Sequence, residues 1–376
     1  MTLNSKWQFE QVKGINKLQV KGLAILFVFL VSQAFTWQAS ATKVKSFDGF
    51  PLTVFVDLPK NSKPKEFFVI AHGSGPMDAD GNLSSMTLPK GSSNLVYKQI
   101  ASVLNSIGYG VIRYHKRAYE TLLKIQADQS YMSSLEYKAF EKNPLTTLVK
   151  DFKAISEYTR KKFKAKKVYG FGHSEGTQVA LFAYVTGLKI DGMVLAGLHN
   201  ERQSTLVLEQ TTYRALKLYF DRVDQDKNGL VDSKEYSAPN QNAQILKQQV
   251  SRIDLNKDGQ ISRDEFLAGN YSNIITQQIT STEYQRDELN YPTAAKIIEA
   301  ASIPISILVA TNDNQTPAYQ VMAMDFLNRQ VWKKKNLNFI YMQGYGHGLD
   351  RRAYEQLLFN KVDTEKLRST LKKINF

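Results

Sequence analysis

The sequence predicts an α/β fold in which a mostly parallel central sheet is covered by helices on both faces. From residue 44 onward, short apolar segments of strand length alternate with amphipathic segments of helix length. This alternation is typical of parallel strands joined by crossover helices. With 376 residues, of which 43% are hydrophobic, the chain can bury a core without crosslinks. One long segment, residues 200–301, breaks the alternation.

The expected elements follow in a regular order. β-branched and aromatic runs indicate strands, and apolar residues three or four positions apart indicate helices. The expected strands are "PLTVFVDL", "EFFVIAHG", "YGVIRYH", "KVYGFGHS", "DGMVLAGLH", "PISILVATND" and "LNFIYMQG". The expected helices lie near residues 94–107, 145–161, 175–185 and 318–328.

The segment 200–301 differs in kind from the rest of the chain. It is rich in Gln, Asn, Asp and helix formers, and it holds no strand-like run of comparable strength. We interpret it as a mainly helical cap, inserted between two strands of one domain and placed above the strand ends. The predicted organisation is a signal peptide over 1–41, a first part of the core over 42–199, the cap over 200–301 and a second part of the core over 302–376.

The N-terminal region has the three parts of a secretory signal peptide. Four lysines precede the apolar run "GLAILFVFLV", and the small-x-small pattern Ala39, Ser40, Ala41 follows it. We expect cleavage near Ala41 and a periplasmic or secreted protein. The alternative is an uncleaved anchor, but the apolar run is short of the roughly 20 residues that a spanning helix needs.

Composition excludes several kinds of site. The chain has no cysteine, which rules out disulfides, thiolate zinc sites, cysteine nucleophiles and a lipidated N-terminal cysteine. The formal net charge of +14 favours loose adsorption to anionic surfaces. The lysines are scattered, however, and no nucleic-acid motif accompanies them. We therefore expect no nucleic-acid partner, and at most a weak association with an anionic envelope surface.

The stretch "GHSEG", Gly172 to Gly176, fits the pattern G-x-S-x-G between an expected strand and an expected helix. Its glycines permit a sharp turn that lifts the Ser174 hydroxyl above the sheet. The N-terminus of the next helix then points toward any negative charge that develops there. Ser174 is the candidate nucleophile. A Gly-rich turn with an incidental serine would be the better interpretation if the pentapeptide stood alone.

A serine hydroxyl needs a base to take its proton. Among the five histidines, His347 in "GYGHGLD" follows both "GHSEG" and the segment 200–301, and the order Ser, acid, His is the one this motif uses. Asp313, in "ATNDNQTP", follows an expected strand and could reach the His347 Nδ1 proton. Asp325 and Asp350 are competitors, but both lie in expected helix or helix-start positions, where an acid usually faces water.

An anion site is expected in "HGSGPMDADGN", residues 72–82, directly after the strand "FFVIA". The backbone amides of a Gly-rich loop can hold a developing oxyanion. We expect the amide of Ser74 to join that of Glu175 in this role. A turn-rich loop without a role is the alternative, which the coincidence with "GHSEG" disfavours.

With these motifs the chain resembles the α/β-hydrolase superfamily, and within it bacterial serine carboxylesterases that read H-G-S-G-P-x-D-x-D-G and G-H-S-E-G. The resemblance covers most of residues 44–199 and 302–376. It implies an α/β-hydrolase fold, the triad of Ser174, Asp313 and His347, and hydrolysis through an acyl-enzyme. Where relatives commonly read R-Y-D-x-R-G, this chain reads "RYHKRA", with His115 and Ala118. That departure puts the local loop geometry and the substrate side of the pocket in doubt.

Two twelve-residue segments inside 200–301 have the spacing of EF-hand loops: "DQDKNGLVDSKE" and "DLNKDGQISRDE". Each offers oxygen at positions 1, 3, 5, 9 and 12, glycine at 6 and an apolar residue at 8. Ca²⁺ takes about six to eight oxygen ligands, which this spacing supplies once the carbonyl at position 7 is counted. The expected ligands are Asp224, Asp226, Asn228, Leu230, Asp232 and Glu235, and Asp254, Asn256, Asp258, Gln260, Ser262 and Glu265.

The helices that enter these loops are also expected, from apolar residues at helical spacing before each loop. These are Leu216, Tyr219, Phe220 and Val223, and Leu246, Val250 and Ile253. Pro239 interrupts the 18 residues between the loops, so the shared helices must be short. We expect two calcium sites with a structural or a regulatory role. A compact pair suits a structural role better than a large opening.

Together these features predict an exported serine hydrolase that cleaves small carboxylic esters and has a calcium-stabilised cap. A peptidase or a thioesterase on the same scaffold is an alternative, because a fold does not fix the substrate. A third interpretation is a calcium-dependent binding protein on a catalytically dead scaffold. It predicts that Ser174 does not react with a fluorophosphonate probe.

Overall fold

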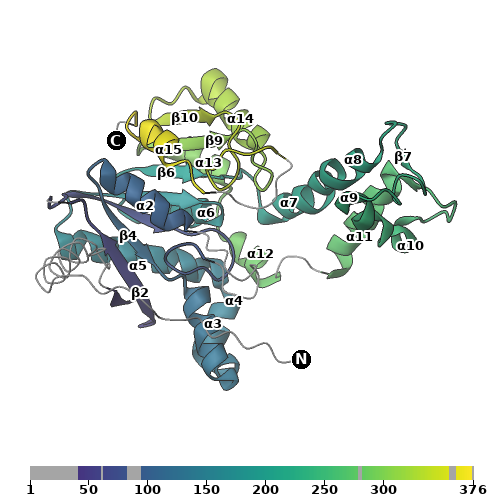
Figure 1. The fold of residues 1–376 in the computed structure, drawn as a ribbon. Helices are drawn as coiled ribbons and strands as arrows, with labels where there is room; N and C mark the ends of the chain where they lie inside the picture. The colour runs from purple at the N-terminus through teal and green to yellow at the C-terminus, as the bar shows by residue number, and fades with distance from the viewer. Residues whose placement is uncertain (1–40, 61, 83–94, 278–281, 355–360, 375–376) are drawn as a thin grey trace, which may run out of the picture. The chain divides into compact units, whose positions relative to one another are not determined.

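The computed structural model describes residues 41–60, 62–82, 95–277, 282–354 and 361–374. The expected signal peptide lies outside the described residues, apart from Ala41. Eight strands form one sheet in the order β1-β2-β4-β3-β5-β6-β9-β10 (Figure 1). Their bounds are β1 Thr42–Lys45, β2 Pro51–Asp57, β3 Glu66–Ala71, β4 Gly110–Tyr114, β5 Lys167–His173, β6 Met193–Ala196, β9 Ile305–Ala310 and β10 Leu337–Met342.

The strand pairing gives the sheet its class. Every neighbouring pair from β4 to β10 is parallel, whereas β1 pairs with β2, and β2 with β4, in antiparallel fashion. The predicted mostly parallel sheet and the α/β-hydrolase fold are confirmed by this order. β1 was not expected, because Val44 alone of its four residues is buried and so gives no alternating pattern.

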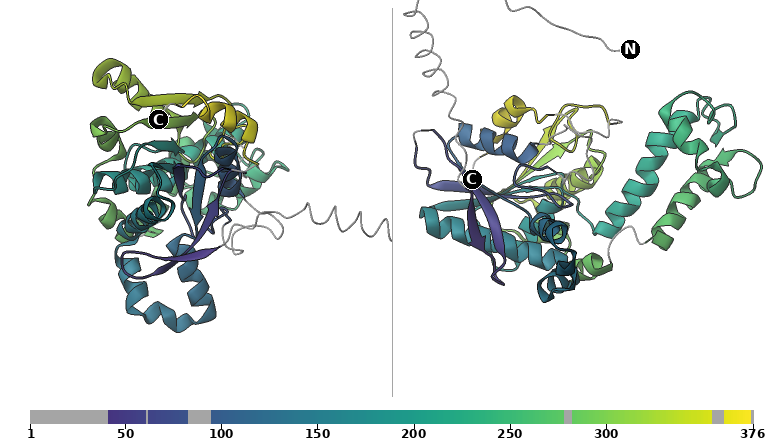
Figure 2. Two further views of the ribbon diagram at one scale, coloured as in Figure 1. Left: turned by 90° about the vertical axis from the view of Figure 1, so that its left-hand side faces the viewer. Right: turned by 60° about the horizontal axis from the view of Figure 1, so that its bottom comes forward.

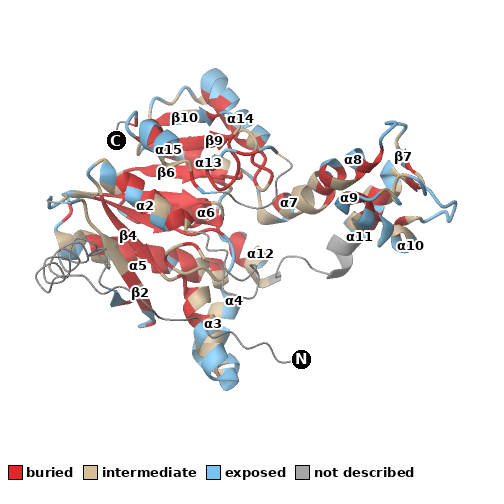
Figure 3. Cartoon of the chain, viewed as in Figure 1, coloured by how far each residue is buried: buried red, intermediate tan, exposed pale blue. Residues whose placement is uncertain are grey.

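Two apolar layers enclose the sheet, one on each face. Successive side chains of a strand point to opposite faces, and in β3 Phe67 and Val69 join one buried cluster while Phe68 and Ile70 join the other. The first cluster packs against α5 Pro144–Phe163, α6 Glu175–Val185, α13 Ala294–Ala300 and α14 Ala318–Leu327. The second packs against α2 Val96–Ser106 and α15 Thr364–Leu371. Figure 3 shows the central strands as buried.

Some helices carried no clear sequence signal. They are α3 Arg117–Ala127, the 3₁₀ turn η1 Gln129–Ser133 and α4 Leu135–Lys142, which follow β4. No residue of α4 is fully buried, and Phe140 is a partly buried side chain of this helix that packs against the first cluster. The C-terminal helix α15 was also missed, although Leu367 and Leu371 pack into the second cluster.

The segment 200–301 is mainly helical, as predicted (Figure 2). Its elements are α7 Gln203–Leu208, the π-helical turns η2 Glu209–Tyr213 and η3 Leu216–Phe220, α8 Asp221–Val223, β7 Leu230–Val231, α9 Gln241–Lys247, α10 Val250–Ile253, β8 Ile261–Ser262, α11 Arg263–Gln277, α12 Thr282–Glu288 and α13. The residues expected on the incoming helices lie in or against one small buried cluster. By contrast, Ala294, Ile297 and Ile298 of α13 pack into the main core.

No helix among the described residues combines the length and the apolar character that crossing a membrane requires.

Candidate active site

The predicted site residues gather where the parallel strands end. The loops after β3, β5, β9 and β10 carry Ser74, Ser174, Asp313 and His347. Because these strands are parallel, their carboxyl ends meet at one edge of the sheet, which is where ligands bind in open α/β sheets. Segments distant in sequence thus share one place.

Ser174 occupies a strained turn between β5 and α6. Its backbone has φ 55° and ψ −125°, and its amide donates to the Ala196 carbonyl at 2.9 Å. A positive φ is unusual for a residue with a side chain. The flanking glycines are required by space: a Cβ at Gly172 would lie 2.7 Å from the Gly176 carbonyl oxygen, and one at Gly176 would collide with the Ala71 carbonyl. The sequence pattern therefore predicts this turn for a steric reason.

His347 and Asp313 are brought together as expected. His347 Nδ1 lies 2.8 Å from Asp313 Oδ2, and both side chains are buried. The amides of Gln315 and Thr316 donate to Asp313 Oδ1, each at 2.8 Å, and the Thr316 hydroxyl donates to Oδ2 at 2.7 Å. Burial by itself would raise the pKa of the Asp313 carboxyl, but His347 and the Thr316 donors outweigh it and lower the pKa. The carboxylate therefore stays charged beside the imidazole.

Ser174 and His347 both lie against the backbone of Ala196 and Gly197, at the end of β6. Ser174 donates its amide to Ala196, and the His347 ring lies against the neighbouring Gly197. A Cβ at Gly197 would lie 2.7 Å from His347 Cε1, and Gly197 has φ +65°. Both side chains also line the same cavity. The serine and the imidazole thus face a common space.

The two competing acids are engaged elsewhere. Neither faces water, contrary to expectation: Asp325 is 5% exposed and Asp350 is fully buried. Asp325 pairs with Arg329 at 2.7 Å and accepts from the Tyr341 hydroxyl at 2.6 Å. Asp350 lies 3.6 Å from Arg352 Nε. Asp350 lies in a loop and not at a helix start, beside Arg352, whereas Asp325 lies in α14 and is covered by Arg329 and by Tyr341 of β10.

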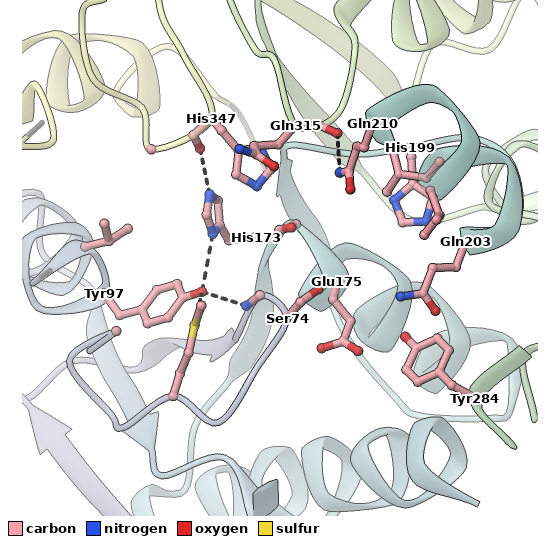
Figure 4. Close-up of a pocket in the computed structure, with 18 residues that line it drawn as sticks. Ser74, Tyr97, His173, Glu175, His199, Gln203, Gln210, Tyr284, Gln315 and His347 are labelled. Carbon is pink, nitrogen blue, oxygen red and sulfur yellow. Dashed lines mark hydrogen bonds between the residues drawn. The ribbon is translucent and has the colours of Figure 1, made fainter. Parts of the chain in front are cut away.

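A second histidine supports the first through a chain of hydrogen bonds that sequence reasoning missed (Figure 4). His173 Nε2 lies 2.7 Å from the His347 carbonyl oxygen, which requires a proton on Nε2. Its Nδ1 lies 3.3 Å from the Tyr97 hydroxyl, which accepts from the Gly73 amide at 2.6 Å. Burial lowers the pKa of His173 to about 4, and the neighbouring His347 adds to this. His173 is therefore neutral and ties the His347 loop to the loop after β3.

The two residues expected to form the anion site lie at the same cavity. Ser74 and Glu175 both line the cavity. Glu175 is the first residue of α6, so its amide is one of the helix's unsatisfied N–H groups. Within the described part of the chain, neither the Ser74 amide nor the Glu175 amide has a hydrogen-bond acceptor. Two backbone donors are thus available beside Ser174.

The stretch "RYHKRA" holds the loop after β3. The Ala79 amide donates to His115 Nδ1 at 2.9 Å, and the Lys116 amide donates to the Met77 carbonyl at 3.2 Å. Burial lowers the pKa of His115, so its Nδ1 remains an acceptor. His115 therefore supplies the acceptor that an aspartate could supply at this position, and the departure leaves the loop anchored.

The cavity at this edge has a volume of about 270 Å³. Part of its wall comes from the segment 200–301, through α7, η2 and α12 (Figure 4). These lining residues are Gln203, Leu206, Val207, Gln210 and Tyr284. His199 also lines it, with its pKa lowered to about 4 by burial and, next, by His347. The insertion thus forms part of the binding surface.

The two twelve-residue loops pair with each other through a short two-stranded sheet. Strands β7 and β8 are antiparallel, with Leu230 opposite Ser262 and Val231 opposite Ile261. Val231 and Ile261, at position 8 of each loop, are fully buried in the small cluster. Gly229 and Gly259, at position 6, have φ +85° and +81°. The sequence analysis placed the glycine and the apolar residue at these positions, but it did not predict the strand pair.

The oxygens of the two loops fit a hard cation. Carboxylate oxygens of Asp224, Asp226 and Glu235 all lie within 4.8 Å of one another. Oδ1 of Asp224 and Oδ1 of Asp254 are buried without a hydrogen-bond partner. A buried carboxylate oxygen without a partner is costly, and both belong to position 1, where an EF-hand aspartate binds its ion. The donor set of the first loop therefore suits Ca²⁺, and the second loop shares its buried oxygen at position 1.

The helix that enters the first loop is bonded to the loop that carries Asp313. Gln210 Nε2 donates to the Gln315 carbonyl at 2.6 Å. Arg214 Nη1 donates to the Asn314 carbonyl at 3.1 Å and to Gln315 Oε1 at 2.8 Å. The Gln315 amide in turn donates to Asp313. One continuous set of contacts thus joins the cap to the acid.

Comparison with known proteins finds similarity to an EF-hand family and to an esterase. A family model described as EF hand matches residues 247–268. The chain is 30% identical over 140 residues to esterase EstD of Thermotoga maritima. That match covers 37% of this chain and 28% of EstD, so the chain spans less than a third of the relative's length.

Solved structures with similar folds include Est1E from Butyrivibrio proteoclasticus, with 14% identity and a TM-score of 0.44 over 89% of this chain and 97% of that one. The esterase EaEST from Exiguobacterium antarcticum has 15% identity and a TM-score of 0.44, over 89% and 98%. The proline iminopeptidase of Mycobacterium smegmatis has 13% identity and a TM-score of 0.49, over 88% and 96%.

Proposed function

We propose that this chain is an exported serine hydrolase that cleaves small carboxylic esters through an acyl-enzyme on Ser174. The observation that carries the proposal is the buried bond from His347 Nδ1 to Asp313, in the wall of a cavity that Ser174 also lines. The partial likeness to an esterase supports the choice of ester over other acyl compounds.

The residues can perform each proton transfer of such a reaction. When His347 Nδ1 donates to Asp313, Nε2 is unprotonated. Nε2 can then accept the proton of Ser174 Oγ while that oxygen attacks the ester carbonyl. The carbonyl oxygen becomes negative between the amides of Ser74 and Glu175. Collapse expels the alcohol, which takes the proton from His347. A water molecule then repeats the sequence and releases the acid.

The cavity favours a small substrate. Its volume of about 270 Å³ lies just below the range of roughly 300 to 1,000 Å³ common for drug-sized ligands. Apolar side chains line it, among them Met77 and Val96 from the first part of the core and Leu206 from the segment 200–301. Short acyl groups should therefore fit better than long chains, which would need the cap segment to move.

Replacement of the nucleophile tests this function. Wild-type protein should hydrolyse short aryl esters and bind a fluorophosphonate probe covalently. Ser174→Ala should lose both, with its melting temperature close to that of the wild type. Ser204→Ala is a matched control, since that serine lies on α7 outside the cavity lining. An unlabelled wild-type protein, or a Ser174→Ala variant with full activity, would refute the proposal.

We also propose that both EF-hand loops bind Ca²⁺, and that the bound ions hold the cap segment that forms part of the cavity wall. A bound ion would neutralise the negative charge of the loop carboxylates. Asp224 and Glu235 would hold the ion in one loop, and Asp254 and Glu265 would hold it in the other. The buried oxygens of Asp224 and Asp254 support this assignment. Arg214 and Gln210 would pass the effect to the loop of Asp313.

Replacing Arg214 tests that connection. Arg214→Met should bind calcium as the wild type does in calorimetry, but its kcat should no longer depend on calcium. Arg222→Met, an exposed arginine in the same helical run, serves as the control. Equal calcium dependence of kcat in both variants would contradict the connection, and the absence of calcium binding in the wild type would contradict the sites.

A further inference from the structure

Lys116 is a buried lysine that contacts groups next to the two amides of the proposed anion site. It is 4% exposed and does not line the cavity. Its Nζ donates to the Gly73 carbonyl at 2.8 Å and forms an ion pair with the Glu175 carboxylate, which is itself 9% exposed. One ammonium group thus joins the loop after β3 to the first residue of α6.

The planarity of the peptide bond makes this contact consequential. The Gly73 carbonyl and the Ser74 N–H belong to the same peptide unit, and in a trans peptide they point in opposite directions. A donor that holds the carbonyl therefore fixes the direction of the N–H on the other side. The preceding peptide is fixed as well, because the Gly73 amide donates to Tyr97 at 2.6 Å.

We propose that Lys116 is a positioning residue that aims the Ser74 amide into the oxyanion site. This inference rests on the proposed function. Glu175 holds the ammonium in place with its side chain while its own amide supplies the second donor. The two donors of the anion site are thereby linked through one ion pair.

The role is one of geometry more than of net charge. Lys116 and Glu175 form a buried pair of opposite charges, so their combined field at the cavity is that of a dipole. Preorganised donors act by standing in the correct direction before the charge develops. The expected consequence of losing Lys116 is therefore weaker binding of the transition state, with substrate binding nearly unchanged.

Kinetics of two Lys116 variants test this role. Lys116→Met should lower kcat by about 10- to 100-fold, below the roughly 10²- to 10³-fold cost of deleting one oxyanion donor, with KM within about threefold. The inhibition constant of an aryl trifluoromethyl ketone, which adds to the serine and forms an oxyanion, should rise in parallel. Lys116→Arg keeps a donor and should recover part of kcat. Lys43→Met is the control, because Lys43 also pairs with a carboxylate, that of Glu120, but outside the site.

A second variant guards against a loss of folding. Lys116→Met leaves the Glu175 carboxylate buried without its cation, which is costly. Lys116→Met combined with Glu175→Gln removes both charges and should fold, with the same loss of kcat. A folded single or double variant with kcat within twofold of the wild type, a loss confined to KM, or the failure of both variants to fold would overturn the positioning role.

The wild-type protein separates this inference from the function on which it rests. Wild-type turnover with loss of activity in Ser174→Ala upholds the hydrolase, whatever Lys116 does. A wild-type protein that neither hydrolyses aryl esters nor reacts with a fluorophosphonate would instead overturn the proposed function, and the role of Lys116 with it.

Discussion

His347 Nδ1 lies 2.8 Å from Asp313 Oδ2, and the two residues come from loops after neighbouring parallel strands. Two backbone amides hold the other carboxylate oxygen, Oδ1, and the Thr316 hydroxyl also donates to Oδ2. The carboxylate therefore orients the ring and fixes the tautomer in which Nε2 is unprotonated. Under the proposed function, this bond prepares His347 to accept the proton of Ser174.

Asp313→Asn should lower kcat by about 10³- to 10⁴-fold with little change in KM. The backbone amides of Gln315 and Thr316 would hold the asparagine oxygen, so its NH₂ group would face His347 Nδ1 and select the wrong tautomer. Steady-state kinetics with a short aryl ester measure this. Asp325→Asn is the control and should keep its kcat, because Asp325 pairs with Arg329. Comparable activity of the two variants would exclude Asp313 as the orienting acid.

Gly197→Ala should displace the His347 ring, because its Cβ would lie 2.7 Å from Cε1 and 3.0 Å from Nδ1. A misplacement of a catalytic group by about 1 Å can lower kcat by about 10²-fold. Gly187→Ala is a matched control: Gly187 also has a positive φ, but nothing lies within 4 Å of its added Cβ. Both variants should lose about 1 kcal/mol of unfolding free energy from backbone strain. An equal kcat in the two variants would show that the ring tolerates the contact.

Stability should fall as the pH drops from about 6.5 toward 4. The pKa values of His173 and His199 are lowered from 6.5 to about 4 by burial, so in this range the unfolded chain binds protons that the folded protein does not. Each histidine then costs up to about 3 kcal/mol of unfolding free energy at the acidic end, and nothing above pH 7.

Urea denaturation at pH 7 and pH 4.5 checks this expectation. His199→Gln should lose about 2 kcal/mol less than the wild type between the two pH values, because one of the two groups is removed. The absolute stability of the variant does not matter, because the experiment compares the change in unfolding free energy between the two pH values. The same loss in both proteins would mean that His199 is not buried as a neutral group.

Glu265→Gln should weaken the thermal stabilisation by calcium. Glu265 occupies position 12, and its carboxylate already accepts from the amides of Leu255 and Ser262 within the loop. Calcium at about 100 times its dissociation constant adds about 2.7 kcal/mol to the unfolding free energy. Asp264→Asn is the control, since this exposed neighbour is not an expected ligand. Melting curves with calcium and with a chelator should differ for the wild type and Asp264→Asn, and much less for Glu265→Gln.

The sequence by itself determined the features whose geometry is local. Gly172 and Gly176 are dictated by contacts within one turn and the strand beside it, and the loop glycines Gly229 and Gly259 by a positive φ inside each twelve-residue loop. Alternating strands and helices likewise determined the parallel sheet. Apart from Gly176, whose added Cβ would collide with Ala71 of β3, these constraints act between residues a few positions apart, so the sequence alone predicts the geometry.

The tertiary structure alone decided which distant groups support the site. His173 bonds the carbonyl of a residue 174 positions away, and Lys116 pairs with Glu175 across 59 positions. No sequence pattern around a single tyrosine, lysine or histidine predicts such a partner, because the order of the strands in the sheet determines which residues become neighbours. The reactive groups could thus be named from the chain, but what holds them in place is determined by packing.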